Sequence, residues 1–152
     1  MSLTQQFRER TIQKTYLALC HGVPEVSQGT ISESILRVDE DRTNKPKVVI
    51  SPRGDRAESR YRVCESCQVD GQMYSVVQVQ PKTGRMHQIR IHMSHIGFPL
   101  VGDKRYGGKR PPVSLPESVS KVFHVDHRGH FLHAQALEFT HPRTGERVVI
   151  SI

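Results

Sequence analysis

A turn signal near the middle of the chain restricts the possible folds more than any other feature. The pair Asp70-Gly71 separates two β-rich runs, RYRVCESCQV and QMYSVVQVQP. Aspartate and glycine both tolerate positive φ, and such a pair between two strand-forming runs is a strong signal for a β-hairpin. The sequence therefore predicts antiparallel strands at about residues 60–69 and 72–80.

The rest of the chain carries shorter strand and helix patterns. A short polar helix is expected over 4–12, and one helical turn over 116–122 within a long loop that bears Gly, Pro and His. A polar loop over 39–47 separates two strand candidates. The strand candidates outside the hairpin are KTYLALCHG (14–22), TISESILRV (30–38), VVI (48–50), FLHAQALEFTHP (131–142) and RVVISI (147–152). Because turns link most neighbouring strands, we expect a single α+β domain over 1–152, with about six strands in a mixed, mainly antiparallel sheet and few helices.

A second helix is expected over about 86–96, because apolar side chains recur there at helical spacing and Gly97 and Pro99 then supply stop signals. The apolar stripe consists of Ile89, Met93 and Ile96. At 100° per residue, the opposite side carries a different set: His87, Arg90 and Ser94. The apolar side is expected to pack, so the other side can face a ligand.

The chain is strongly basic. Its 22 Lys and Arg against 15 Asp and Glu give a formal net charge of +7 and a pI near 9.7. Such an excess favours a polyanionic partner, and nucleic acid is the leading candidate. No apolar run approaches the roughly 20 residues that span a bilayer, so no membrane partner is expected.

Cysteine usage and the first residues bear on the cellular compartment. Cys20, Cys64 and Cys67 are an odd number and make no disulfide framework, so free thiols in a reducing compartment are expected. The start, MSLTQQFRER, lacks the apolar stretch of a secretory signal. Cytoplasmic residence is therefore the expectation.

Metal and nucleotide-phosphate sites find little support in the sequence. CESC (64–67) has the spacing of a zinc or redox pair, but no second CxxC or histidine pair follows at usable spacing. His87 and His92 are five apart and diverge on a helix, and the HEXXH, G-x-S-x-G, GxGxxG and P-loop patterns are absent. A polar loop carries three further histidines: His124, His127 and His130. These are more typical of a solvated or phosphate-facing patch, so a metal-binding protein is only a minor alternative.

The stretch TGRMHQIRIHMSHIGFPLVGDKRYG (83–107) closely resembles the signature of the RluA-type family of RNA pseudouridine synthases, approximately TGRxHQIRxHxxxxGxPLxGDxxYG. Two further segments match in the same order. KTYLALCHG resembles the family's K-x-Y-x-A-x-x-x-G strand, and FLHAQALEFTHPRTGE resembles its terminal LHA-x-x-L-x-F-x-HP-x-TGE. The resemblance covers almost the whole chain, and so many matched positions are far more specific than the net charge.

The resemblance implies a pseudouridine synthase fold and an isomerase that uses neither metal nor organic cofactor. Members of this family convert uridine in RNA to pseudouridine: an aspartate nucleophile detaches uracil, which is then rejoined through carbon 5. The target base has to leave its stack, be held by stacking, and meet an ionised carboxylate oriented by a cation. The implied substrate is ribosomal or transfer RNA.

The match also implies roles for individual residues. Tyr16 is the aromatic side chain that stacks on the flipped uracil, and Arg90 is the arginine that pairs with the catalytic aspartate. Arg85 and His87 match further positions of the signature and either hold the loop or contact RNA phosphate. A basic surface for the RNA backbone is extended by four more residues: Lys14, Lys82, Lys104 and Arg105.

The family's nucleophile has no counterpart in this sequence. It belongs to an R-L-D-x-x-[ST]-G segment upstream of the strand that KTYLALCHG matches, and Asp103 in VGDKRYG matches a different, non-nucleophilic position. The resemblance therefore implies the C-terminal portion of a catalytic domain, inactive as a separate chain and prone to self-association through an exposed sheet edge. A non-catalytic RNA-binding module is the alternative.

Overall fold

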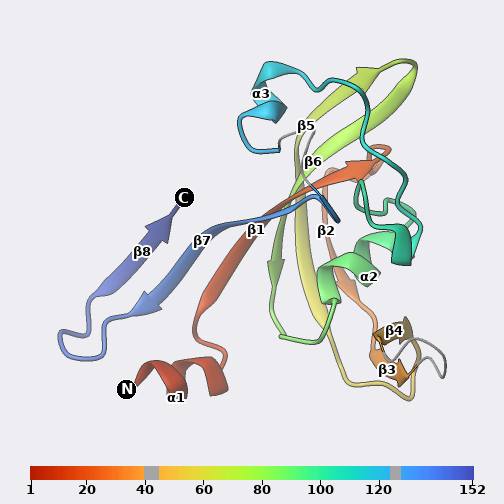
Figure 1. Ribbon diagram of the computed structural model, residues 1–152. Helices are drawn as coiled ribbons and strands as arrows, with labels where there is room; N and C mark the ends of the chain where they lie inside the picture. The colour runs from red at the N-terminus through yellow and green to blue at the C-terminus, as the bar shows by residue number, and fades with distance from the viewer. Residues whose placement is uncertain (40–44, 124–127) are drawn as a thin grey trace.

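The computed structural model describes residues 1–39, 45–123 and 128–152. Its centre is a six-stranded sheet in the order β2-β5-β6-β1-β7-β8, and a separate two-stranded sheet pairs β3 with β4 (Figure 1). Every pairing among the described strands is antiparallel. The strands are β1 (Gln13–His21), β2 (Gln28–Ser32), β3 (Ile35–Asp39), β4 (Pro46–Ile50), β5 (Glu58–Val69), β6 (Gln72–Pro81), β7 (Leu132–Thr140) and β8 (Arg147–Ser151).

The helices are few and short. They are α1 (Leu3–Arg8), α2 (Gln88–His95), α3 (Glu117–Ser120) and the 3-10 helix η1 (Lys104–Tyr106). In the part of the chain that the structure describes, no helix is long and apolar enough to cross a membrane. Figure 1 shows the hairpin of β7 and β8 extending away from the rest of the sheet, on the same side of the molecule as α1.

The hairpin that the sequence predicts at Asp70-Gly71 is confirmed. Asp70 has a φ of 50° and Gly71 a φ of 77°, the left-handed values that these two residue types tolerate. Val69 pairs with Gln72 across the turn, so β5 and β6 form one long hairpin at the centre of the sheet. The predicted α+β class with a mainly antiparallel sheet is likewise confirmed.

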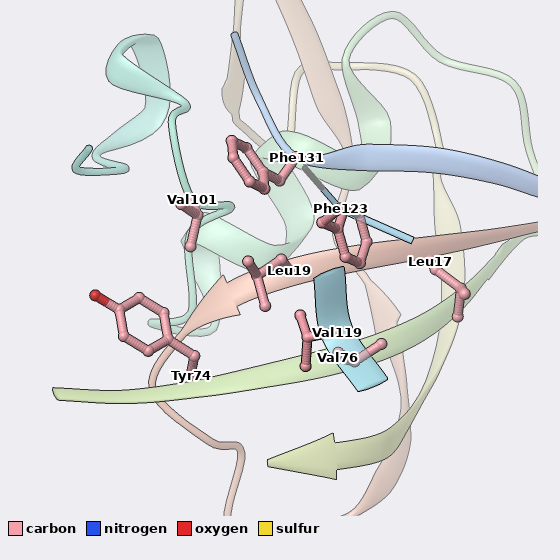
Figure 2. Close-up of a cluster of buried hydrophobic side chains, with 8 residues drawn as sticks. All are labelled: Leu17, Leu19, Tyr74, Val76, Val101, Val119, Phe123 and Phe131. Carbon is pink, nitrogen blue, oxygen red and sulfur yellow. The ribbon is translucent and has the colours of Figure 1, made fainter. Parts of the chain in front are cut away.

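One face of the sheet carries a cluster of apolar side chains that α3 covers. Leu17 and Leu19 of β1 pack there with Tyr74 and Val76 of β6. The cluster also takes in Phe131, which is fully buried and comes just before β7. Figure 2 shows these side chains gathered in one group from strands and loops that are distant in sequence.

The opposite face is covered by α2. Side chains alternate along a strand, so a different set points to this side: Ala18, Cys20, Val77 and Val79. Ile89 and Met93 of the predicted apolar stripe are buried against them, and Ile96 is half-buried at the edge of the same cluster. The packing side predicted for this helix is therefore confirmed.

The region between β2 and β4 differs from the prediction. The expected single strand over 30–38 is two strands in different sheets, because β2 ends at Ser32 and β3 begins at Ile35. Two residues between them carry the chain from one sheet to the other, and the strand-like composition on both sides conceals this break. The polar loop predicted over 39–47 falls mostly on residues 40–44, which lie outside the described residues.

The helices are shorter than predicted. α2 begins at Gln88 rather than at residue 86, because His87 before it has a left-handed φ of 53° that ends helical geometry. α1 ends at Arg8, four residues before the predicted end of the helix over 4–12, and α3 lies within the predicted turn over 116–122.

His92 anchors α2 to the sheet. Its ring is fully buried, with Nδ1 2.8 Å from the Ser59 hydroxyl and Nε2 2.9 Å from the Glu33 carbonyl oxygen. Because a carbonyl oxygen only accepts, Nε2 carries the hydrogen and the Ser59 hydroxyl donates to Nδ1. Burial lowers the pKa of His92 below its usual value, so the ring is neutral and bridges two parts of the chain.

We expect the protein to lose stability as the pH falls from about 7.5 to about 5. Histidine in the unfolded chain titrates near about 6.5, whereas burial lowers the pKa values of His21, His87 and His92 in the folded chain. The unfolded state therefore binds more protons in this window, and the stabilisation present above about pH 6.5 is lost as the pH falls toward the lowered values. Urea unfolding at several pH values measures the slope of the free energy of unfolding against pH. His92→Gln should flatten it, and an unchanged slope in that variant would contradict the neutral, buried state of His92.

Candidate active site

An open pocket of about 410 Å³ lies where β1, α2, the start of β7 and the loop between β6 and α2 meet. Five of the residues singled out in the sequence line it: Lys14, Tyr16, Arg85, His87 and Arg90. Ile89 and Leu132 add apolar wall. No carboxylate is found among the described residues that line this pocket. The predicted stacking aromatic and the predicted arginine thus share one hollow.

The alternation of β1 places Tyr16 at the pocket. Tyr16 points to the same side as Ala18 and Cys20, which are buried under α2, and it is half-buried at the rim of their cluster. Beside it, the pairing of β1 with β7 shifts between Thr15 and Tyr16, and one residue of β7, Gln135, is left over. Such a bulge bends the strand locally, and this one lies beside Tyr16, three residues after Leu132, the β7 residue among the described pocket lining.

Arg90 is held by a two-point ion pair with Asp103. Its Nε lies 2.9 Å from one carboxylate oxygen, and its Nη2 lies 2.8 Å from the other. The Asp103 side chain is fully buried, whereas that of Arg90 is 15% exposed. The hydrogen bonds to Asp103 raise the pKa of Arg90. The third guanidinium nitrogen, Nη1, takes no part in this pair.

The resemblance implied that Arg90 pairs with a catalytic aspartate, and its carboxylate partner within the described residues is Asp103. The resemblance matches Asp103 itself to a signature position that is not the nucleophile. Its two oxygens are both occupied by Arg90, and its side chain has no exposure to solvent. This carboxylate is therefore placed to hold the arginine rather than to attack a substrate.

A closed turn after α2 buries the Asp103 carboxylate. The Asp103 carbonyl oxygen accepts the backbone N–H of Tyr106 at 3.2 Å and that of Gly108 at 2.7 Å. Gly108 has no room for a side chain, since a Cβ atom there would lie 2.0 Å from the Leu100 carbonyl oxygen. The GDKRYGG sequence is thus a compact turn that presents one carboxylate to α2.

Tyr106 supports the pocket from behind. Its ring centre lies 5.0 Å from the guanidinium carbon of Arg90, a cation–π contact. Its hydroxyl lies 2.6 Å from His87 Nδ1 and accepts the Val48 N–H at 3.2 Å. The Ser94 hydroxyl donates to the Tyr106 carbonyl oxygen at 2.6 Å. The helix side predicted to face a ligand therefore packs partly on Tyr106: His87 and Arg90 line the pocket, and Ser94 is directed at the tyrosine backbone.

Gln88 fixes the loop that precedes α2, and sequence reasoning gave it no role. Its side-chain oxygen accepts hydrogen bonds from the Thr83 hydroxyl at 2.7 Å and the Arg85 N–H at 3.1 Å. Its side-chain nitrogen donates to the Glu58 carbonyl oxygen at 2.8 Å and to the Ser59 hydroxyl at 2.9 Å. The buried amide thus ties the pocket loop to β5. The only sequence signal was its place within HQIR.

A second hollow of about 300 Å³ adjoins the pocket, and we call it the basic hollow. Its cationic residues are Arg8, Arg10, Lys14, Lys82 and Arg85. Among the described residues that line it, none is acidic. Arg8 and Arg10 come from the end of α1 and the turn after it, and sequence reasoning missed them because they lie far from the signature. Lys14 and Arg85 belong to both hollows.

The remaining members of the predicted basic surface lie elsewhere. Lys104 and Arg105 belong to η1, and neither is among the described residues that line the pocket or the basic hollow. The Arg105 Nη2 donates to the Lys45 carbonyl oxygen at 2.9 Å. The structure therefore gathers Lys14, Lys82 and Arg85 and leaves these two apart.

The structure also describes the three cysteines and part of the histidine-bearing loop. All three cysteines are free thiols, as expected, with Cys20 buried and Cys64 exposed. His130 lines the pocket, whereas His124 and His127 lie outside the described residues. Within residues 1–39, 45–123 and 128–152, no group of three or more His, Cys, Asp or Glu side chains is placed to hold a metal ion.

Sequence comparisons relate the chain to one family of known proteins. Residues 1–95 match the model of a family described as RNA pseudouridylate synthase. The chain is 36% identical over 147 residues to an uncharacterised RNA pseudouridine synthase of Bacillus subtilis, covering 97% of this chain and 42% of that protein. It is 39% identical over 148 residues to ribosomal large subunit pseudouridine synthase D of Pseudomonas aeruginosa, covering 96% of this chain and 43% of that protein.

A solved structure is similar over the same extent. Human RNA Pseudouridylate Synthase Domain Containing 1 superposes with a TM-score of 0.66 at 28% sequence identity, over 98% of this chain and 57% of that one. The chain spans less than half the length of the curated relatives that it matches.

Proposed function

The chain belongs to the RNA pseudouridylate synthase family, and we propose that it forms the part of a catalytic domain that holds the target uridine while uridine is isomerised to pseudouridine in RNA. The observation that carries this proposal is that Tyr16 and Arg90, which belong to two matched segments far apart in the sequence, line the same pocket. An aromatic ring and a fixed guanidinium in one hollow suit a base that has left its stack and a carboxylate that acts on it.

The proposed roles follow from the contacts. Tyr16 stacks on the extruded base, because its ring is half-buried and borders the pocket. Arg90 orients the nucleophilic carboxylate: Asp103 fixes its Nε and Nη2, and the permanently charged guanidinium still borders the pocket. No carboxylate is found among the described residues that line the pocket, and we propose, as the resemblance implies, that an upstream aspartate segment supplies the nucleophile.

The basic hollow is proposed to hold the RNA backbone next to the target base. Its five cations face no acidic residue within the described lining, and Lys14 and Arg85 continue it into the pocket. Phe7 at its margin is 50% exposed, with the Lys14 Nζ 5.3 Å from its ring centre. Cations beside an exposed aromatic ring are a combination that binds single-stranded RNA. We propose ribosomal or transfer RNA as the substrate class.

Pseudouridine formation is the direct test. We expect no product from the 152-residue chain alone and product from a longer polypeptide whose upstream segment supplies an aspartate. In that polypeptide, Arg90→Lys should lower the rate by about 10²-fold, because lysine cannot replace a two-point guanidinium contact. Tyr16→Ala should cost about 1–3 kcal/mol of base binding, and Tyr16→Phe, the matched control, should retain most of it.

The outcomes separate two functions. Substantial turnover by the 152-residue chain itself would contradict the external nucleophile. A longer polypeptide that binds RNA tightly but forms no pseudouridine would favour the alternative of a non-catalytic RNA-binding module. Loss of RNA binding in every form would reject both.

Salt dependence tests the basic hollow. Each phosphate contact releases counterions, so Lys82→Gln should weaken RNA binding and reduce the slope of log K against log salt by about 0.7 to 1. Lys121→Gln is the matched control, because this exposed lysine is not among the described residues that line the basic hollow. It lies at the end of α3, with its Nζ 3.7 Å from Glu117 Oε1. Equal slopes for both variants would contradict the assignment of Lys82.

We also propose self-association through β8. This strand forms one edge of the six-stranded sheet and exposes 61% of Val149 and 51% of Ile150. An apolar, unpaired edge strand readily pairs with another chain. Size-exclusion chromatography should show a species larger than a monomer that Val149→Lys returns to monomer size. A wild-type monomer at all concentrations would contradict this proposal.

A further inference from the structure

His87 stands in an unusual backbone conformation at the pocket. It is the residue before α2, has a φ of 53° and a ψ of 23°, and makes no side-chain cap to the helix. A left-handed conformation costs a non-glycine residue roughly 1–2 kcal/mol. Such outliers persist where the surrounding structure fixes them, and they cluster at functional sites. The contacts of this side chain therefore bear on function.

The ring of His87 is oriented by Tyr106. Its Nδ1 lies 2.6 Å from the Tyr106 hydroxyl, which also accepts the backbone N–H of Val48 at 3.2 Å. Tyr106 is almost fully buried, and a buried hydroxyl hydrogen needs an acceptor. Of the two hydrogen-bond partners described for this hydroxyl, the Val48 N–H can only donate, so the acceptor for the hydroxyl hydrogen is His87 Nδ1. The hydrogen of a neutral His87 ring is then on Nε2.

The surroundings keep this ring neutral. Burial lowers the pKa of His87, and the positive charges of Arg90 and Arg105 lower it further, against an opposing contribution from Asp103. A neutral imidazole has one donor and one acceptor, and Tyr106 has taken the acceptor. What the ring can still offer is therefore an N–H donor.

That donor is on the pocket side of the ring. His87 lines the pocket, whereas Tyr106 lies beneath it and is not among the described lining residues. Because Nδ1 is turned toward the buried tyrosine, the edge that carries Nε2 is turned away from it. Tyr16 and Arg90 border the same space. An N–H donor beside an aromatic platform is suited to a planar ligand with a carbonyl oxygen at its edge.

We propose that His87 reads the target base by donating its Nε2–H to the O4 carbonyl oxygen of uracil, and that Tyr106 is the positioning residue that sets this tautomer. The proposal rests on the proposed function and names the contact that makes the pocket selective. Uracil has carbonyl acceptors at both positions that flank its N3, whereas cytosine replaces one of them with an amino donor. A donor that faces the amino group finds no acceptor, so cytosine is rejected.

Three variants separate the donor from the backbone strain. His87→Asn tolerates the left-handed conformation, but its short amide does not extend to the Nε2 position. His87→Gln places an amide N–H near the Nε2 position, but glutamine adopts the left-handed backbone conformation less readily than asparagine. Tyr106→Phe keeps the ring beneath Arg90 and removes only the hydroxyl. Thermal unfolding of each variant reports the structural effect separately from binding.

The readouts are nitrogen NMR of the His87 ring and the affinities for uridine monophosphate and cytidine monophosphate. We expect the Nε2–H tautomer in the wild-type chain and a mixture of tautomers in Tyr106→Phe. Wild-type protein should prefer the uridine nucleotide by about tenfold. His87→Asn should lose this preference while it is the more stable of the two His87 variants, and His87→Gln should retain part of it while it is the less stable.

Three results would overturn the proposal. They are an Nδ1–H tautomer in the wild-type chain, an equal loss of affinity for both nucleotides in His87→Asn, and no binding of uridine monophosphate at millimolar concentration. None of these readouts requires turnover. The Nε2–H tautomer and the uridine preference can be found even when none of the longer polypeptides forms pseudouridine. In that case the base contact stands and the proposed isomerase function fails.

Discussion

The ion pair between Arg90 and Asp103 is the interaction on which the pocket depends. A carboxylate with no exposure to solvent is costly unless a cation and hydrogen bonds compensate it, and Arg90 supplies both through two nitrogens. The pair joins α2 to the turn that precedes η1, two segments with no other charged link of this kind among the described residues. It also determines the plane of the guanidinium, which would otherwise rotate on a flexible side chain.

The rest of the site is arranged around that pair. Tyr106 lies against the guanidinium on one side and against the His87 ring on another, and its hydroxyl reaches the backbone of β4 through Val48. On the sheet side, Gln88 and His92 bind α2 to β5 through buried hydrogen bonds. The pocket residues are therefore supported by segments from three parts of the chain, and the two sheets are joined through the helix that carries Arg90.

Local signals in the sequence predicted the elements that local chemistry decides. Asp70-Gly71 specifies its own turn by backbone conformation, and the spacing of Ile89 and Met93 specifies which side of α2 is buried. The family resemblance indicated Tyr16 and Arg90 as site residues, and both line one pocket in the structure.

What the sequence left open depends on contacts between distant segments. Nothing local marks the change of sheet between β2 and β3, because strand-forming residues stand on both sides. Asp103 lies in the VGDKRYG segment, yet only the fold brings its carboxylate to Arg90. Arg8 and Arg10 join the basic hollow because α1 ends beside the loop after β6, which no spacing in the sequence indicates.

The central claim is that Arg90 and Asp103 act as one unit, and a double-mutant cycle on the free energy of unfolding tests it most directly. Arg90→Gln and Asp103→Asn each leave a buried or half-buried polar group without its partner, whereas the double variant relieves both defects. The account predicts that the two effects are non-additive, with a coupling energy of about 2 kcal/mol or more. Effects that add to within about 0.5 kcal/mol would show that the two residues act independently and would contradict it.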